Sequence, residues 1–309
     1  MPLILILLLG SGLLAQQKDD EIPVFRSGVT LVKVDIAVTT GAGRAIGDLT
    51  QQDFTVFDEN ERQEIAYFGR ESEPLDLLLL LDISGSMRRS LEDVASVTRA
   101  ALAQLHAGDR VGLMLFSRRA EVIQELTPDF GATQHKILDS IYKQSLGSGT
   151  LINESLIAAG DYMKRQPVKG RRAILIVTDN EGLNYKSPDA EVVRAMLSAD
   201  TVLNALVVRK GARPPAVKRA GYTNPDFAPP DVFSISERTG GEAVEGLGKV
   251  GELFPKMIER VRSRYFIQYP APHAEAGAFR RVRVELTPAA RRKYPGAVVR
   301  AREGYYAAQ

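Results

Sequence analysis

The sequence has no cysteine among its 309 residues and only three histidines. Without cysteine the chain forms no disulfide, carries no lipid-anchored cysteine and uses no thiol as a nucleophile. It also lacks an excess of charge of either sign, because 40 Lys and Arg residues face 38 Asp and Glu residues, for a formal net charge of +2. A nearly neutral chain gives no strong case for nucleic-acid binding. We therefore expect no nucleic acid among its partners.

The apolar segment at residues 2–15, PLILILLLGSGLLA, is too short to cross a bilayer as a helix, which takes about 20 residues. The polar run QQKDDE follows it, although no Lys or Arg precedes it. This pattern is typical of the core of a secretory signal peptide, with cleavage after Ala15. We expect an exported protein, located in the periplasm, at the cell surface or in the medium, with no transmembrane helix in the mature chain.

The length predicts about two domains, and the patterning divides the chain further. Residues 24–72 show short alternating segments without helical periodicity, which predicts an all-β segment. Residues 265–309 return to the same pattern after a different central region. We expect these two terminal pieces to form one β-sandwich. The strands predicted in them are 29–38, 53–58, 63–68, 265–269, 281–286 and 297–302.

Residues 74–264 alternate buried strands with amphipathic helices, interrupted by a loop at 210–230 that is rich in Pro, Gly, Arg and Lys. This alternation predicts a doubly wound, Rossmann-like α/β domain with parallel strands and right-handed crossovers. Ser90, with Asp93 three residues later, resembles a capping box at the start of the first helix. The predicted strands are 77–82, 109–117, 120–126, 173–179 and 202–208. The predicted helices are 91–105, 132–144, 151–165, 190–199 and 250–264.

Oxygen-bearing side chains follow two of the predicted strands. The apolar run LLLLLDISGSM places Asp82 at a strand end, with Ser84 and Ser86 in the turn behind it. Asp179 ends the second apolar strand, and Thr150 follows a glycine-rich loop before a helix. In an open doubly wound sheet, ligands bind beyond the carboxyl ends of the strands, so these five side chains are expected at one site.

Two carboxylates and three hydroxyls, without His or Cys, favour a hard cation. Mg²⁺ is expected first, with Mn²⁺ or Ca²⁺ possible, and Zn²⁺ or Cu²⁺ is disfavoured. Mg²⁺ normally keeps some of its waters in proteins. An outside carboxylate can take such a water position, so the site is suited to gripping an Asp or Glu of a partner protein.

Three enzyme classes share some of these features but fail on their own motifs. A phosphatase of the haloacid dehalogenase type needs a second carboxylate at the position of Ser84. A serine hydrolase needs a Gly-x-Ser-x-Gly turn and a partnered histidine. A phosphate-binding loop needs a lysine directly after its glycine-rich segment, and Leu151 follows Thr150 instead. We therefore expect no enzymatic activity.

The DISGS sequence at 82–86, the GSGT loop ending at Thr150 and the VTD sequence ending at Asp179 resemble the three motifs of a von Willebrand factor type A domain. The resemblance covers roughly residues 74–264. It implies a metal-ion-dependent adhesion site in which Ser84, Ser86 and Thr150 bind Mg²⁺ through hydroxyls, while Asp82 and Asp179 bind directly or through water. Asn180 departs from the pattern, since many members have glycine there.

The flanking segments resemble a group of bacterial exported proteins with such domains, through the strand-rich lead at 34–68 and the AREGYY sequence at 301–306. Together these features predict an exported, metal-dependent protein-binding module of the adhesion type. The alternative is an accessory or structural cell-envelope subunit that scaffolds a complex, in which the metal is mainly stabilising.

Overall fold

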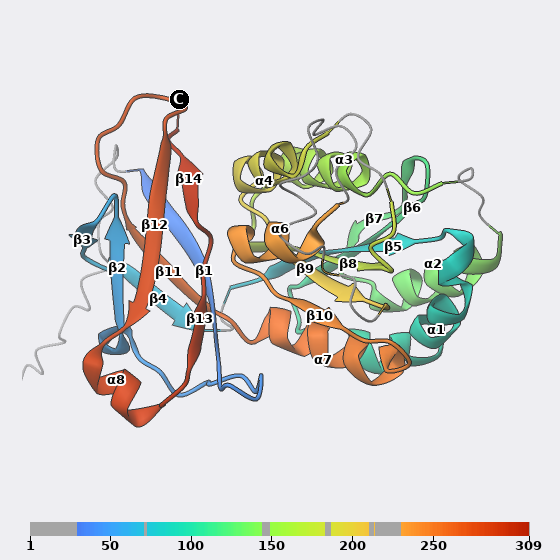
Figure 1. Ribbon diagram of the computed structural model, residues 1–309, viewed down its shortest axis with the longest axis horizontal. Helices are drawn as coiled ribbons and strands as arrows, with labels where there is room; N and C mark the ends of the chain where they lie inside the picture. The colour runs from blue at the N-terminus through green and yellow to red at the C-terminus, as the bar shows by residue number, and fades with distance from the viewer. Residues whose placement is uncertain are drawn as a thin grey trace, which may run out of the picture.

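The computed structural model describes residues 30–70, 73–143, 149–182, 187–209, 213 and 230–308. The predicted signal peptide at 2–15 and most of the predicted loop at 210–230 lie outside these residues. Two bodies lie side by side: a six-stranded sheet covered by helices, and a pair of antiparallel four-stranded sheets (Figure 1). Among the described helices, none combines the length and the apolar character that a membrane span requires.

The six-stranded sheet has the order β10-β9-β8-β5-β6-β7. The strand β5 is central, and its eight residues are all buried, because helices cover both faces. Leu77, Leu79 and Leu81 pack on one face, against α1, α2 and α7, whereas Leu78 and Leu80 pack on the other, against α3, α4 and α6. This two-sided burial explains the unbroken apolar run and confirms the doubly wound α/β fold. The strands are β5 (Leu75–Asp82), β6 (Arg110–Phe116), β7 (Ala120–Thr127), β8 (Arg171–Thr178), β9 (Val202–Val207) and β10 (Ala243–Glu245).

Helices α3, α4 and α6 are above the sheet in Figure 1, and α1 and α7 are below it. The helices of this body are α1 (Arg88–Leu102), α2 (Phe130–Lys143), α3 (Ile152–Arg165), α4 (Asp189–Ser198), α6 (Val232–Thr239) and α7 (Val250–Arg262). The strand β7 departs from the predicted parallel pairing, because it runs antiparallel to β6. Only residues 117–119 join the two strands, and a parallel crossover needs a dozen residues or more.

The antiparallel sheets have the orders β13-β1-β11-β4 and β14-β12-β2-β3. Each sheet combines strands from both ends of the chain, which confirms the β-sandwich with the α/β domain inserted between its parts. The core between the sheets contains Ile36, Val56, Tyr265 and Val284. The elements are β1 (Leu31–Thr39), η1 (Gln51–Asp53), β2 (Phe54–Asp58), β3 (Glu61–Gln63), β4 (Tyr67–Arg70), β11 (Tyr265–Pro270), β12 (Phe279–Leu286), α8 (Pro288–Lys293), β13 (Val298–Arg300) and β14 (Gly304–Tyr306).

At or just after two predicted strands, the chain passes from one sheet to the other. The expected strand 63–68 is wrong, because β3 pairs with β2 while β4 pairs with β11 in the other sheet. The expected strand 297–302 is shortened to β13, which pairs with β1, and the chain then enters the other sheet as β14, which pairs with β12. Alternating polarity marks a half-buried strand but does not show where the chain passes from one sheet to the other.

The predicted capping box at Ser90 and Asp93 is wrong. The helix α1 begins at Arg88, directly after the single turn η2 (Gly85–Met87), so Ser90 lies inside its first turn. Four short helices and strands were not predicted: α6, β10, α8 and β14. Both of these helices begin at an N-capping residue that the sequence contains. The side chain of Asp231 accepts from the backbone N–H groups of Phe233 and Ser234 at 3.1 Å at the start of α6, and Thr287 caps α8 just before Pro288.

Candidate metal centre

Asp82 and Asp179 lie at the same edge of the six-stranded sheet. Asp82 is the last residue of β5, and Asp179 directly follows β8. These strands are parallel neighbours, with Leu81 opposite Val177, so their carboxyl ends are adjacent. Asp82 is fully buried and Asp179 is 7% exposed. The structure therefore brings the two predicted carboxylates together at the floor of the candidate site.

The DISGS turn links these carboxylates by hydrogen bonds. The backbone N–H of Ser84 donates to Oδ1 of Asp82 at 2.9 Å. The hydroxyl of Ser86 donates to Oδ2 of Asp179 at 2.6 Å, and the Ser84 and Ser86 hydroxyl oxygens are 3.3 Å apart. Met87, buried at the end of η2, anchors the turn in the core. Four of the five predicted side chains thus form one connected polar cluster.

Thr150 lies at the same end of the domain but is not hydrogen-bonded to this cluster. It precedes α3, and the next residue, Leu151, donates its backbone N–H to the carbonyl of Ser117 at 2.9 Å, just past β6. A Cβ at Gly182 would come within 2.7 Å of the Thr150 carbonyl oxygen. The backbone of Thr150 is therefore packed against the loop that follows Asp179. Within the described ranges, no hydrogen bond joins the Thr150 hydroxyl to the other four residues.

Thr178, the middle residue of the VTD sequence, is a member of the cluster to which the sequence analysis assigned no role. Its hydroxyl donates to Oδ2 of Asp82 at 2.7 Å, so both oxygens of Asp82 accept hydrogen bonds from the protein. The available signal was its position, since a hydroxyl residue ends the strand next to the one that ends at Asp82. Thr178 thus fixes the orientation of the Asp82 carboxylate at the buried side of the cluster. The Asp179 side of the cluster is nearer to solvent.

Comparison with known families adds to this geometry. Residues 77–182 match the family model described as von Willebrand factor type A domain. The chain contains a von Willebrand factor type A domain. The matched segment includes all five predicted site residues, and a domain of this kind supports a protein-interaction or adhesion-type role. No curated protein gives a significant match to the chain.

Several solved structures are similar to parts of the chain. An aerotolerance-related membrane protein from Bacteroides fragilis NCTC 9343 is 18% identical, over 60% of this chain and 98% of that one, with a TM-score of 0.45. BatB from Bacteroides thetaiotaomicron is 20% identical over 60% and 98%, with a TM-score of 0.44. A von Willebrand factor type A structure from Catenulispora acidiphila is 11% identical over 92% and 76%, with a TM-score of 0.47. All three TM-scores lie below 0.5.

The residues of the type A domain fit a hard divalent cation. Burial raises the pKa of the Asp82 carboxyl to about 6, hydrogen bonds from Ser84 and Thr178 oppose that rise, and the charge of Asp179 adds to it. A cation between two such carboxylates favours their charged forms. In the described part of the chain no group of three or more His, Cys, Asp or Glu side chains is placed to hold a metal, so an ion here depends on hydroxyl oxygens as well. Ser84 is half-buried and Ser86 is exposed, which opens the hydroxyl side of the cluster to solvent.

Asn180 gives the loop after Asp179 its shape. Its φ of +58° lies in the left-handed region, which asparagine tolerates better than most residues with a side chain. Its amide also donates to the carbonyl of Pro230 at 3.3 Å. The departure from glycine at this position therefore keeps the backbone conformation that glycine would adopt and adds a hydrogen bond.

We expect Asn180→Ala to be less stable than Asn180→Gly by about 1 kcal/mol, because alanine resists a positive φ. Both variants lose the side-chain hydrogen bond, so their difference isolates the backbone conformation. Urea unfolding followed by circular dichroism measures it. Equal unfolding midpoints for the two variants would show that the left-handed conformation is not required in solution.

Proposed function

We propose that the type A domain is a metal-dependent protein-binding module that captures a carboxylate of a partner protein. Asp82, Ser84, Ser86, Thr150 and Asp179 would hold the ion, with Asp82 and Asp179 supplying its charge balance. The observation that carries the proposal is the hydrogen-bonded cluster of two carboxylates and two serine hydroxyls, buried on the Asp82 side and open on the Ser86 side. That arrangement supports an ion held by the protein on its Asp82 side and accessible to solvent on its Ser86 side.

The donor chemistry supports Mg²⁺ first, with Mn²⁺ or Ca²⁺ as further candidates, because every proposed ligand atom is oxygen. Two carboxylates neutralise a divalent ion, and Mg²⁺ demands six ligands in an octahedral arrangement. The ion would therefore keep water, and the carboxylate of an Asp or Glu side chain can replace a water. The proposed role of the five residues is to hold the ion and orient its open position.

Exposed arginines around the site support an acidic partner. They follow the carboxyl ends of three strands: Arg88 and Arg89 begin α1, Arg118 and Arg119 lie between β6 and β7, and Arg209 follows β9. Arg209 forms an ion pair with Glu181, two residues past Asp179. A basic rim attracts an acidic surface and increases the rate at which it finds the site.

Binding rather than catalysis is our proposal for this site, in line with the generally non-enzymatic character of type A domains. We also infer export, on the evidence of the apolar segment at residues 2–15. The second candidate is a cell-envelope scaffold in which the ion mainly stabilises the fold. The two candidates differ in what a chelator does: under the first it abolishes partner binding, and under the second it lowers only the melting temperature.

A display selection tests the proposal while the partner is still unidentified. A random peptide library is selected on the immobilised chain in Mg²⁺ and eluted with EDTA. We expect enriched peptides to share an Asp or Glu, and replacement of that residue by Asn or Gln to weaken binding at least about tenfold. The reason is that an amide cannot supply the negative charge that a carboxylate brings to a cation.

The matched control is the same selection on Asp179→Ala, which removes a proposed ligand, beside Asp161→Ala, which removes an exposed carboxylate from α3. Asp161→Ala should enrich the same peptides as the wild type, and Asp179→Ala should enrich none of them. Peptides without a carboxylate, or binding that survives both EDTA and Asp179→Ala, would refute carboxylate capture.

A further inference from the structure

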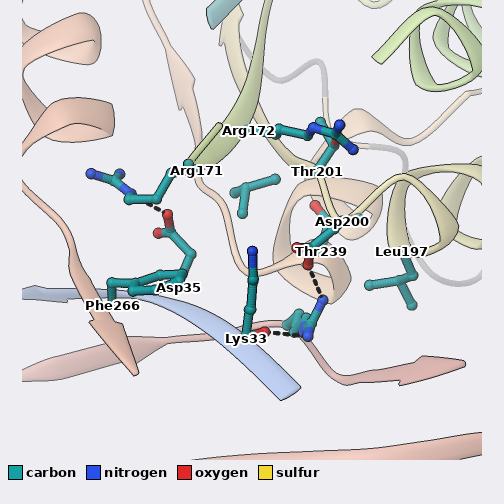
Figure 2. A pocket seen from close by; sticks show the side chains of 12 residues that line it. Lys33, Asp35, Arg171, Arg172, Leu197, Asp200, Thr201, Thr239 and Phe266 are labelled. Carbon is teal, nitrogen blue, oxygen red and sulfur yellow. Dashed lines mark hydrogen bonds and ion pairs between the residues drawn. The ribbon is translucent and has the colours of Figure 1, made fainter. Parts of the chain in front are cut away.

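The surface where the β-sandwich meets the type A domain contains a cavity lined by four basic and two acidic side chains. The basic residues are Lys33, Arg171, Arg172 and Arg302, and the acidic residues are Asp35 and Asp200. Lys33 and Asp35 belong to β1, on the face opposite the sandwich core, whereas Arg171 and Arg172 begin β8 (Figure 2). The cavity is therefore at the amino ends of the parallel strands, opposite the candidate metal centre.

Both acidic side chains already have basic partners. Asp35 accepts from Nε of Arg171 at 2.5 Å and forms a second ion pair with Arg264. Asp200 pairs with Arg302 at 2.5 Å. One carboxylate is thus shared by two guanidinium groups, and the other is committed to one. Among the described residues that line the cavity, no acidic side chain is left to balance Lys33 or Arg172.

Arg172 is 6% exposed, yet in the described ranges its guanidinium donates to backbone carbonyl oxygens alone. It donates to the carbonyls of Ala199 at 3.0 Å and Gln166 at 2.5 Å. Its Nε, and the Nε of Arg302, are buried without an acceptor in the described part of the chain. A buried donor without an acceptor, on a charge without a counter-charge, is costly.

Lys33 adds a third unbalanced donor. Figure 2 shows its side chain extending from β1 into the cavity, with Asp35 and Arg171 on one side and Asp200 and Thr201 on the other. Among the residues that the structure describes, its ammonium group forms no hydrogen bond or ion pair. The backbone carbonyl of Lys33 accepts from Arg302, which fixes the strand in place beside the cavity.

We propose that this cavity binds a compact inorganic anion, of the size of chloride to phosphate, through Lys33, Arg172 and Arg302. The space open to the centre of a water-sized sphere is about 20 Å³. One water needs roughly 10–15 Å³ on this measure, so the space suits a small ion and excludes a large organic one. The anion supplies the missing negative charge beside Lys33 and Arg172. Because its ligands come from both bodies, it ties the β-sandwich to the type A domain.

Thermal melting of the chain in sodium gluconate, titrated with sodium chloride or sodium phosphate at constant ionic strength, tests the site. Gluconate is too bulky for the cavity and controls for screening. We expect one of the two small anions to raise the melting temperature in a saturable way, by about 2–4 °C, because a ligand that binds only the folded state stabilises it. A rise that never saturates, or one no larger than gluconate gives, would mean that no anion site exists.

Lys33→Met provides the decisive variant, since it removes a partly exposed charge and leaves the fold intact. It should melt no lower than the wild type in gluconate, because it relieves repulsion from Arg172, and its response to the anion should fall at least about tenfold in apparent affinity. Lys164→Met, on the exposed face of α3, should behave as the wild type. A full response in Lys33→Met would mean that Lys33 does not bind the anion, and melting well below the wild type in gluconate would mean that Lys33 already has a counter-charge inside the protein. Either result overturns the proposal.

Discussion

Mg²⁺ and Mn²⁺ are expected to bind the purified chain, and Asp82→Ala and Asp179→Ala are expected to weaken that binding at least about 100-fold. Each substitution removes one of the two carboxylates proposed to hold the ion, and loss of even an outer partner of a metal ligand typically costs about 10–100-fold in affinity. Asp82 offers a further reason, since its carboxylate is held by Ser84 and Thr178 at the floor of the site. Isothermal titration calorimetry measures the effect.

The controls separate lost ligands from lost folding. Asp161→Ala, an exposed position on α3, should bind the ion as the wild type does. Asp82→Ala removes a buried carboxylate whose pKa burial already raises, so the metal-free variant should unfold no earlier than the metal-free wild type. Far-UV circular dichroism checks that both site variants are folded. Undiminished binding by folded Asp82→Ala and Asp179→Ala would remove the metal site and, with it, the proposed mechanism.

The candidate site was predictable to the extent that its residues lie in short local motifs. Asp82, Ser84 and Ser86 are placed by one turn after one strand, so a strand end and a glycine define their arrangement. Asp179 required a further step, namely that β5 and β8 are neighbours in the sheet, which follows from their fully buried patterns. The contribution of Thr178 depends on side-chain orientation in the folded strand, which polarity patterns do not report.

The contact between the two bodies was not predictable in the same way. The alternation of β1 correctly places Val34 and Ile36 in the sandwich core and Lys33 and Asp35 on the opposite face. Such a face is normally exposed to solvent, but in this protein the type A domain packs against it. Asp35 meets Arg171 and Arg264 across 136 and 229 positions of sequence, and no local pattern connects residues at such separations.

Asp35→Ala is expected to lower the free energy of unfolding by about 3–5 kcal/mol, because it leaves the buried guanidinium groups of Arg171 and Arg264 without their shared carboxylate. The side chains of these two arginines are 1% and 3% exposed, so water cannot replace the lost partner. Urea unfolding followed by circular dichroism measures the change. Glu252→Ala, which breaks an exposed ion pair with Lys256 on α7, should unfold as the wild type does.

The same cluster gives the stability a defined dependence on pH. Burial alone would raise the pKa of the Asp35 carboxyl, but attraction to Arg171 and Arg264 and hydrogen bonds from both outweigh it and lower the pKa below its ordinary value. A carboxyl with a lowered pKa in the folded state stabilises the protein above its unfolded pKa of about 3.9, and this contribution is lost as the pH falls towards the folded value. The difference in stability between wild type and Asp35→Ala should therefore be constant from about pH 5 to 7 and shrink below about pH 4. A difference that is unchanged at pH 3 would show that Asp35 acts through packing and not through its charge.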